Sequence, residues 1–351
     1  MSDPQVERGR GATGNPAGRF ERLAVITERI DDDDERPPTA TEIYRDTSKS
    51  ILSYNDSPDV GMAVYLNAYR GCEHGCIYCY ARPYHEYLGL SAGVDFESKI
   101  FVKENAAALL GKELAAKSWT PQGIGFSGVT DPYQPIERRL KLTRACLEVM
   151  AEFRNPVGIV TKSHTVTRDI DVLAELAKHR AAQVMLSITT LDDDVAAVME
   201  PRASRPARRL EAVRAMAAAG IPVGVMVAPI VPGLTDHELP AILKAAAEAG
   251  AKTAGRIVVR LPHGVKDLFA DWLEAHFPDR KEKVLNRLRA MRHGKLNDPN
   301  FGARMAGDGP FAEAIHQVFN LHCRRLGYTR KMELSTDAFR HPPGPQRGLF
   351  D

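Results

Sequence analysis

Three cysteines, Cys72, Cys76 and Cys79, lie within a span of eight residues in a chain that holds five cysteines in all. Disulfide pairing would leave one of the three over, so their thiolates are better suited to a metal or a metal cluster. Structural zinc usually takes four ligands, and His74 or His85 could complete such a site. Ferredoxins supply four cysteines to a [4Fe–4S] cluster, but the spacing C-x3-C-x2-C has no fourth cysteine nearby. Three thiolates can hold three irons of a cubane and leave the fourth iron open to a substrate or cofactor.

Two glycines, Gly71 and Gly75, stand inside this motif. Glycine accepts backbone conformations that other residues resist. The motif therefore predicts a chain wrapped tightly around a metal centre.

The elements that must position this motif alternate between short apolar segments and longer helical ones, which is the pattern of an α/β fold. The predicted strands are Met62–Asn67, Gly123–Gly128, Val157–Thr161, Gln183–Thr189, Pro222–Val231 and Arg256–Leu261. The predicted helices between them are Asn105–Lys117, Leu140–Phe153, Arg168–His179, Ala207–Ala219 and Asp236–Ala249. The strands are rich in Val, Ile and Met, as parallel strands buried on both faces require. We expect a partial (βα)6 barrel of the TIM type; an open doubly wound sheet is the alternative, although no Gly-x-Gly-x-x-Gly follows the first strand.

Polar side chains interrupt the carboxyl ends of these strands, where parallel barrels collect their chemistry. The three cysteines follow the first predicted strand. The polar groups after the later strands are Ser127, Thr130-Asp131, Thr161-Lys162-Ser163, Ser187, Thr189 and Arg260. All of these groups are expected to face one mouth of the barrel.

The cysteine motif, with an aromatic residue before its last cysteine and its place after the first strand, is similar to that of the radical S-adenosylmethionine (radical SAM) superfamily. The stretches Tyr69–Gly89, Gly125–Glu137 and Val160–Ser163 resemble the spore photoproduct lyase-like branch. The resemblance covers about Ser57 to Leu261.

This resemblance implies a [4Fe–4S] cluster on Cys72, Cys76 and Cys79, and S-adenosylmethionine (SAM) chelating the open iron. One electron then yields methionine and a 5′-deoxyadenosyl radical that abstracts hydrogen. The electron would come from a donor such as flavodoxin or ferredoxin. The resemblance also implies the residues that bind SAM. Ser127 or Thr130 would lie near the methionine amine and Lys162 near the carboxylate. Tyr78 would lie near the adenine, and Ser187 and Pro229–Val231, with Ile230 at the centre, would line the ribose and adenine.

One position departs from that branch. Spore photoproduct lyase returns hydrogen to the repaired thymine radical from a cysteine in the loop after the second strand, and Gly128 takes its place here. The tyrosines that flank the third motif cysteine, Tyr78 and Tyr80, are present and could form part of a hydrogen relay. A different lesion or a different route is therefore expected, and Cys146 and Cys323 are predicted to be core thiols.

The chain of 351 residues has a net charge of +2, but that charge is unevenly distributed. Between Arg280 and Arg347 there are 14 Lys and Arg against six Asp and Glu. This excess permits a phosphate-bearing partner, with Arg304, Arg324 and Arg325 as candidate contacts, or only a solvated helix face. We expect a disordered tail over residues 1–40, the barrel over 57–261, a helical basic extension over 262–335 and a flexible tail over 336–351.

No apolar run reaches the length of a membrane span and no secretory signal is evident, so a cytoplasmic protein is expected. At the carboxyl end, Gln346-x-x-Leu349-Phe350 resembles the short peptide by which DNA repair and replication proteins dock on the bacterial sliding clamp. Arg347 stands where that motif usually has Leu.

The sequence thus predicts a radical SAM enzyme with a nucleic-acid or nucleotide-like substrate, related to DNA repair. Two alternatives remain: the same fold acting on a protein or small molecule, and a structural zinc module that serves as an interaction protein.

Overall fold

The computed structural model describes residues 9–12, 14–15, 40–126, 128–329 and 332–342. Its main sheet has seven strands in the order β10-β9-β8-β7-β6-β3-β2. Six of them are parallel: β3 (Val64–Leu66), β6 (Ile124–Phe126), β7 (Val157–Thr161), β8 (Ala182–Ser187), β9 (Val223–Ile230) and β10 (Thr253–Val258). β2 (Leu52–Tyr54) closes one edge antiparallel to β3. The six sequential parallel strands form an open sheet, the predicted partial (βα)6 barrel.

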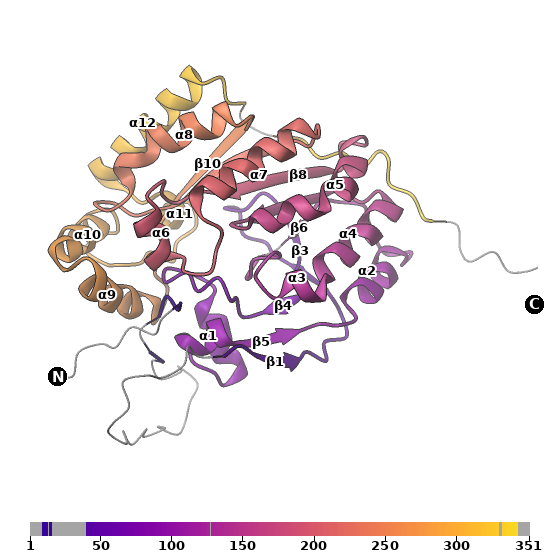
Figure 1. Cartoon of the computed structure of the whole chain (residues 1–351), viewed down its shortest axis with the longest axis horizontal. Helices are drawn as coiled ribbons and strands as arrows, with labels where there is room; N and C mark the ends of the chain where they lie inside the picture. The colour runs from indigo at the N-terminus through magenta and orange to yellow at the C-terminus, as the bar shows by residue number, and fades with distance from the viewer. Residues whose placement is uncertain (1–8, 13, 16–39, 127, 330–331, 343–351) are drawn as a thin grey trace, which may run out of the picture.

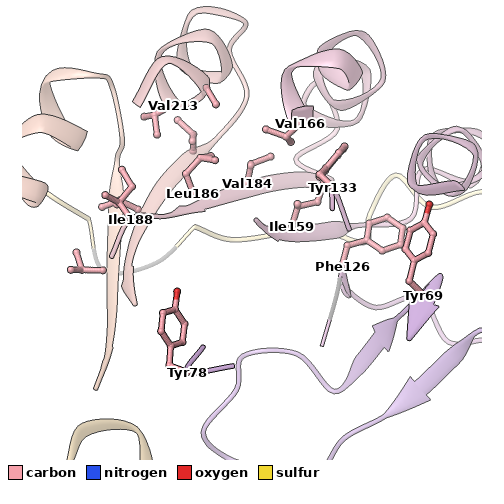
Figure 2. Close-up of a cluster of buried hydrophobic side chains, with 14 of the residues drawn as sticks. Tyr69, Tyr78, Phe126, Tyr133, Ile159, Val166, Val184, Leu186, Ile188 and Val213 are labelled. Atoms are coloured by element: carbon pink, nitrogen blue, oxygen red, sulfur yellow. The ribbon is translucent and has the colours of Figure 1, made fainter. Parts of the chain in front are cut away.

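Helices follow the strands and cover the outside of the sheet (Figure 1). They are α2 (Ala106–Leu114), α3 (Glu137–Leu140), α4 (Leu142–Phe153), α5 (Ile170–Ala177), α6 (Asp193–Met199), α7 (Pro206–Ala218) and α8 (Leu239–Glu248). Ile159, Val184 and Leu186 lie between the strands and the helices and are fully buried, as Figure 2 shows. The other face is less covered than predicted: Val160 of β7 is 45% exposed, and β8 alternates between buried and half-buried residues over Ala182–Leu186.

A smaller sheet, absent from the sequence prediction, lies beside the barrel. It pairs β1 (Glu42–Arg45), β5 (Lys99–Val102) and β4 (Tyr69–Arg70). Between β4 and β5 the chain forms the cysteine loop, the 3-10 helix η1 (Arg82–Leu88) and the short helix α1 (Val94–Ser98). The small sheet therefore anchors both ends of the segment that carries the cysteines.

The segment after β10 is helical, as predicted: α9 (Val265–His276), α10 (Pro278–Ala290), α11 (Ala303–Ala306) and α12 (Gly309–Arg325). α12 packs on α8, and the Tyr328 hydroxyl just beyond it donates to the Leu243 carbonyl at 2.7 Å. No helix of the described residues is long and apolar enough to cross a membrane.

The predicted tails need correction where the structure describes them. Arg10 and Ala12 are buried, and Arg10 donates to the Glu97 carbonyl at 2.7 Å. At the other end, the Phe339 ring lies 6.2 Å from that of Phe153, and Arg340 Nε donates to the Glu152 carbonyl at 3.0 Å. The sequence did not predict these contacts, because the two segments contain few apolar residues. Backbone amides and guanidinium groups make most of the contacts instead.

Glu137 joins four parts of this fold. Its buried carboxylate pairs with Arg168 at 2.8 Å, accepts from the Thr143 backbone amide at 3.1 Å, and accepts a hydrogen bond from the Tyr69 hydroxyl. We expect Glu137→Ala to lower the free energy of unfolding by about 3 kcal/mol or more, because it leaves the buried Tyr69 hydroxyl and Thr143 amide without their acceptor and removes one of the two carboxylates that pair with Arg168. Urea unfolding followed by circular dichroism measures this loss.

Glu148→Ala is the matched control, since it removes an exposed carboxylate that pairs with Arg144. This change should cost less than about 1 kcal/mol. Equal losses for the two variants would contradict the role of Glu137.

Candidate active site around the three cysteines

The cysteine loop runs from the end of β4 to η1 without regular structure. Cys72 donates its backbone amide to the Phe96 carbonyl at 2.9 Å, and Cys79 donates to the Cys76 carbonyl at 3.1 Å. Gly71 and Gly75 have φ of 79° and 66°, in the left-handed region, so the prediction for both glycines is confirmed. A Cβ at Gly75 would lie 2.7 Å from the Glu97 carboxylate, so a larger residue would also displace the group behind the loop.

A fully buried arginine fills the centre of this loop. Arg82 donates to the carbonyls of Cys76 at 2.9 Å and Gly93 at 3.0 Å, and forms an ion pair with the buried Glu97 at 2.5 Å. Glu97 also accepts the backbone amides of Gly11 at 3.0 Å and Ala12 at 2.9 Å. The pair thus satisfies backbone groups that an irregular buried loop would otherwise leave unpaired.

The three thiols are free, and each is poorly exposed. Burial raises the pKa of each one, to about 12 for Cys76, and the charge of Lys162 opposes this rise at Cys76 and Cys79. The negative charges of Cys76 and Cys79 would also raise the pKa of Cys72, which places the three sulfurs within electrostatic reach of one another. Soft thiolates grouped beside a cation, with Cys72 buried and Cys76 and Cys79 half-buried, fit a [4Fe–4S] cluster, and binding it would release their protons.

The two histidines that could complete a zinc site are engaged elsewhere. His85 Nε2 lies 3.0 Å from the Lys99 carbonyl, with its ring against Phe96 and Phe101. His74 Nδ1 lies 3.3 Å from the Asp131 carboxylate. A single ion needs ligands that converge on one point, and no group of three His, Cys, Asp or Glu side chains does so within the described part of the chain.

Lys162 and Tyr78 meet at the inner side of the loop. Lys162 follows β7, and its Nζ lies 5.7 Å from the centre of the Tyr78 ring. The Tyr78 hydroxyl donates to Glu200, which also accepts from Thr189 Oγ1 at 2.7 Å and pairs with Arg209. Figure 2 shows the Tyr78 ring directed at the sheet near Ile188.

Glu200 is buried, and burial by itself would raise its pKa. The charges of Arg209 and Lys162 and the hydrogen bonds from Arg209 and Tyr78 outweigh that effect and hold the pKa at about 2. The site is therefore charged: a carboxylate lies between two cations beside the thiols. Glu200, Arg209 and Thr189 were not among the predicted site residues, and only the position of Thr189 at a strand end gave a signal for any of them.

The loop after β6 also reaches this site. Asn67 Oδ1 accepts the backbone amides of Gly128 at 3.0 Å and Val129 at 3.1 Å, and the Tyr80 hydroxyl donates to the Gly128 carbonyl. Thr130 lies in this loop, half-buried. Ser127 lies outside the described residues.

Asp131 ties the same loop to β7. It accepts from Thr161 Oγ1 at 2.7 Å and from the Lys162 backbone amide at 2.8 Å. Burial would raise the pKa of Asp131, but His74 and these hydrogen bonds lower it to about 2. Asp131 thereby fixes the backbone from which Lys162 reaches the cysteines.

The remaining predicted cofactor residues line the next strand ends. Ser187 closes β8, where its carbonyl accepts from Arg209 Nη1 at 3.0 Å. Ile230 closes β9, where its carbonyl accepts from the Val259 amide at 2.9 Å. Both are buried. Cys146 is buried in α4 and Cys323 is half-buried in α12, outside the site.

Comparison with known proteins agrees with this arrangement. The sequence model of the Radical SAM superfamily matches residues 66–246. The protein Rv2578c of Mycobacterium tuberculosis, itself uncharacterised, is 35% identical over 239 residues, which cover 67% of this chain and 69% of that protein. A protein of Pseudomonas phage M6, named Radical SAM Nalpha-GlyT isomerase, is 21% identical over 292 residues, which cover 82% of this chain and 56% of that protein.

Among solved structures, a spore photoproduct lyase variant with bound AdoMet and dinucleoside spore photoproduct is similar, with a TM-score of 0.57. The match covers 82% of this chain and 80% of that one at 18% identity, so it shows a shared fold. The chain belongs to the radical SAM superfamily, whose members are enzymes that use a [4Fe–4S] cluster and SAM and need a reductant. The cluster interpretation thus replaces the structural zinc module.

We expect Cys72→Ser, Cys76→Ser and Cys79→Ser each to abolish cluster binding, because each removes one of the three soft ligands. Iron and sulfide bound per chain after anaerobic reconstitution measure this loss. Cys146→Ser and Cys323→Ser are matched controls and should bind as much iron as the unaltered protein. Full iron and sulfide content in any of the three motif variants would show that the ligand assignment is wrong.

Proposed function

We propose that this enzyme abstracts hydrogen from a nucleic-acid substrate, in a reaction related to DNA repair or DNA modification. The proposal draws on the names of two similar proteins, a spore photoproduct lyase with bound dinucleoside spore photoproduct and a phage protein named Radical SAM Nalpha-GlyT isomerase. A cytoplasmic location and an electron donor such as flavodoxin or ferredoxin belong to the same proposal.

The observation that carries the cofactor part of the proposal is the position of Lys162. Its ammonium group lies over the Tyr78 ring and acts electrostatically on Cys76 and Cys79. A cation at this place suits the carboxylate of a cofactor that chelates a metal held by the cysteines. Asp131 positions Lys162 through its backbone amide.

Cys72, Cys76 and Cys79 would hold the cluster, which together with SAM supplies a 5′-deoxyadenosyl radical for hydrogen abstraction. Lys162 would bind the methionine carboxylate, and Thr130 or Ser127 the amine. Tyr78, Ser187 and Ile230 would line the adenosine moiety. Burial of Ser187 and Ile230 would help to exclude water from it.

The two proposed catalytic tyrosines differ in access. Tyr78 is 6% exposed and bonded to Glu200, whereas Tyr80 is 44% exposed. Tyr80 also lies against Gly128, the position at which spore photoproduct lyase has its hydrogen-donating cysteine. Tyr80 is therefore the better placed of the two to exchange hydrogen with a substrate.

Anaerobic turnover tests this function. The reconstituted, dithionite-reduced enzyme should convert SAM to 5′-deoxyadenosine, and deuterium from a perdeuterated thymidine oligonucleotide should enter that product. Lys162→Gln should raise the KM for SAM about tenfold or more, because it removes a charge-assisted contact, while iron content stays unchanged. Cleavage of SAM with no deuterium transfer from DNA or RNA would refute the nucleic-acid substrate but leave the enzyme class intact.

Sliding-clamp docking is a separate proposal, because Gln346, Leu349 and Phe350 lie outside the described residues. A peptide of residues 342–351 should bind the bacterial clamp in a fluorescence polarisation assay, and replacement of Leu349 and Phe350 by Ala should abolish binding, because these are the apolar anchors. No detectable binding by the unaltered peptide would contradict it.

A further inference from the structure

The mouth of the barrel carries an arginine whose charge is not matched by a carboxylate of its own. Arg260 follows β10, and its Nε is buried without a hydrogen-bond partner among the described residues. Its Nη1 lies 3.7 Å from the sulfur of Met305, a weak acceptor. The charge of Asp59 acts on Arg260, but Asp59 is already paired with Arg304. A half-buried guanidinium in this position has donors left for another molecule.

Two further arginines surround Arg260. Arg292 is fully buried and donates to the carbonyls of Val259 at 2.8 Å and Arg304 at 3.2 Å, so it fixes the chain on both sides of Arg260. Arg304, a predicted phosphate contact, instead bonds Asp59 and Ser57. The positive charge of Arg304 lowers the pKa of Arg260, after the larger effect of burial. Three cations thus lie beside few acids, which favours an anion here.

Aromatic rings border the same place. The Arg260 guanidinium lies 5.5 Å from the centre of the Tyr80 ring, and that of Arg304 lies 4.4 Å from the centre of the Phe301 ring. Tyr80, Tyr84 and Phe301 are all exposed large aromatics. Exposed rings interleaved with guanidinium groups suit a single nucleic-acid strand, whose bases stack and whose phosphates pair.

We call the surface formed by Arg260, Arg304, Tyr80, Tyr84 and Phe301 the rim. Tyr80 connects the rim to the cysteines, because it directly follows Cys79. A single nucleic-acid strand lying on the rim would therefore place a base close to the cysteines. Arg260, which follows β10, lies over the Tyr80 ring, and the Tyr80 hydroxyl donates to the Gly128 carbonyl in the loop after β6.

We infer that Arg260 binds a backbone phosphate of the nucleic-acid substrate and thereby sets which nucleotide lies beside Tyr80. This inference rests on the proposed nucleic-acid substrate and adds to it a named contact. The guanidinium group of Arg260 would recognise the phosphate through a charge-assisted, bidentate hydrogen bond.

Binding of a fluorescein-labelled, single-stranded oligodeoxythymidylate of about twelve nucleotides, within the span that one such surface covers, tests the inference. The affinity of the reconstituted enzyme is measured across a series of salt concentrations, with SAM affinity measured in parallel. Arg260→Gln should weaken binding about tenfold and reduce the slope of log affinity against log salt by about 0.7, the value for one phosphate contact on a single strand. An uncharged methylphosphonate oligonucleotide should bind both proteins equally.

Arg256→Gln is the matched control. Arg256 lies on β10, four residues before Arg260, but contacts His316 and the Phe319 ring of α12, so its loss should leave affinity and slope unchanged. Unchanged iron content and SAM affinity in Arg260→Gln show that the variant is folded.

Three outcomes would overturn the inference. Tight oligonucleotide binding with the same slope in Arg260→Gln would reject the contact alone. A loss of SAM affinity equal to the loss of oligonucleotide affinity would assign Arg260 to the cofactor. No binding of DNA, or of the matching RNA oligonucleotide, by the unaltered enzyme would reject this contact and the nucleic-acid substrate together, while SAM cleavage would still report on the enzyme class.

Discussion

The ion pair between Arg82 and Glu97 is the interaction on which the site depends. Both side chains are fully buried, and together they bond the carbonyls of the cysteine loop and the amides of residues 11 and 12. Burying two charges is costly unless they pair and their other hydrogen-bonding capacity is met, as it is here. An irregular loop cannot satisfy its own backbone, so this pair supplies the hydrogen-bond partners that allow the loop and its cysteines to be buried or half-buried.

A second buried charge network links the loop to the barrel. Arg209 bonds Glu200 and the carbonyl of Ser187, and Glu200 accepts the Tyr78 hydroxyl from within the cysteine motif. Lys162 adds a further cation from β7. Three thiolates would place negative charge in a protein interior of low dielectric constant, which costs electrostatic free energy. The neighbouring cations would offset part of that cost. The barrel thus contributes electrostatics as well as shape to the cysteines.

Much of this fold could be predicted from sequence, because short apolar runs rich in β-branched residues alternate with longer helical segments. β7 has the predicted bounds, and each other barrel strand lies within a few residues of its prediction. The small sheet could not be predicted, since β1 is exposed along its whole length and has no apolar pattern. At the site, the cysteines and Lys162 were recognisable from motif and position. The sequence did not identify Arg82, Glu97, Glu200 and Arg209 as site residues. A charged residue is normally expected on the surface, and its burial can be predicted only when its distant partner is known.

We propose that the three cysteines would hold an iron–sulfur cluster and that Lys162 would bind the carboxylate of SAM. An anaerobic crystal structure of the reconstituted enzyme with SAM, with anomalous data at the iron and zinc edges, distinguishes a cluster from a zinc site. We expect iron at Cys72, Cys76 and Cys79, with the SAM carboxylate bonded to Lys162. A zinc signal with His74 or His85 as a ligand would contradict it.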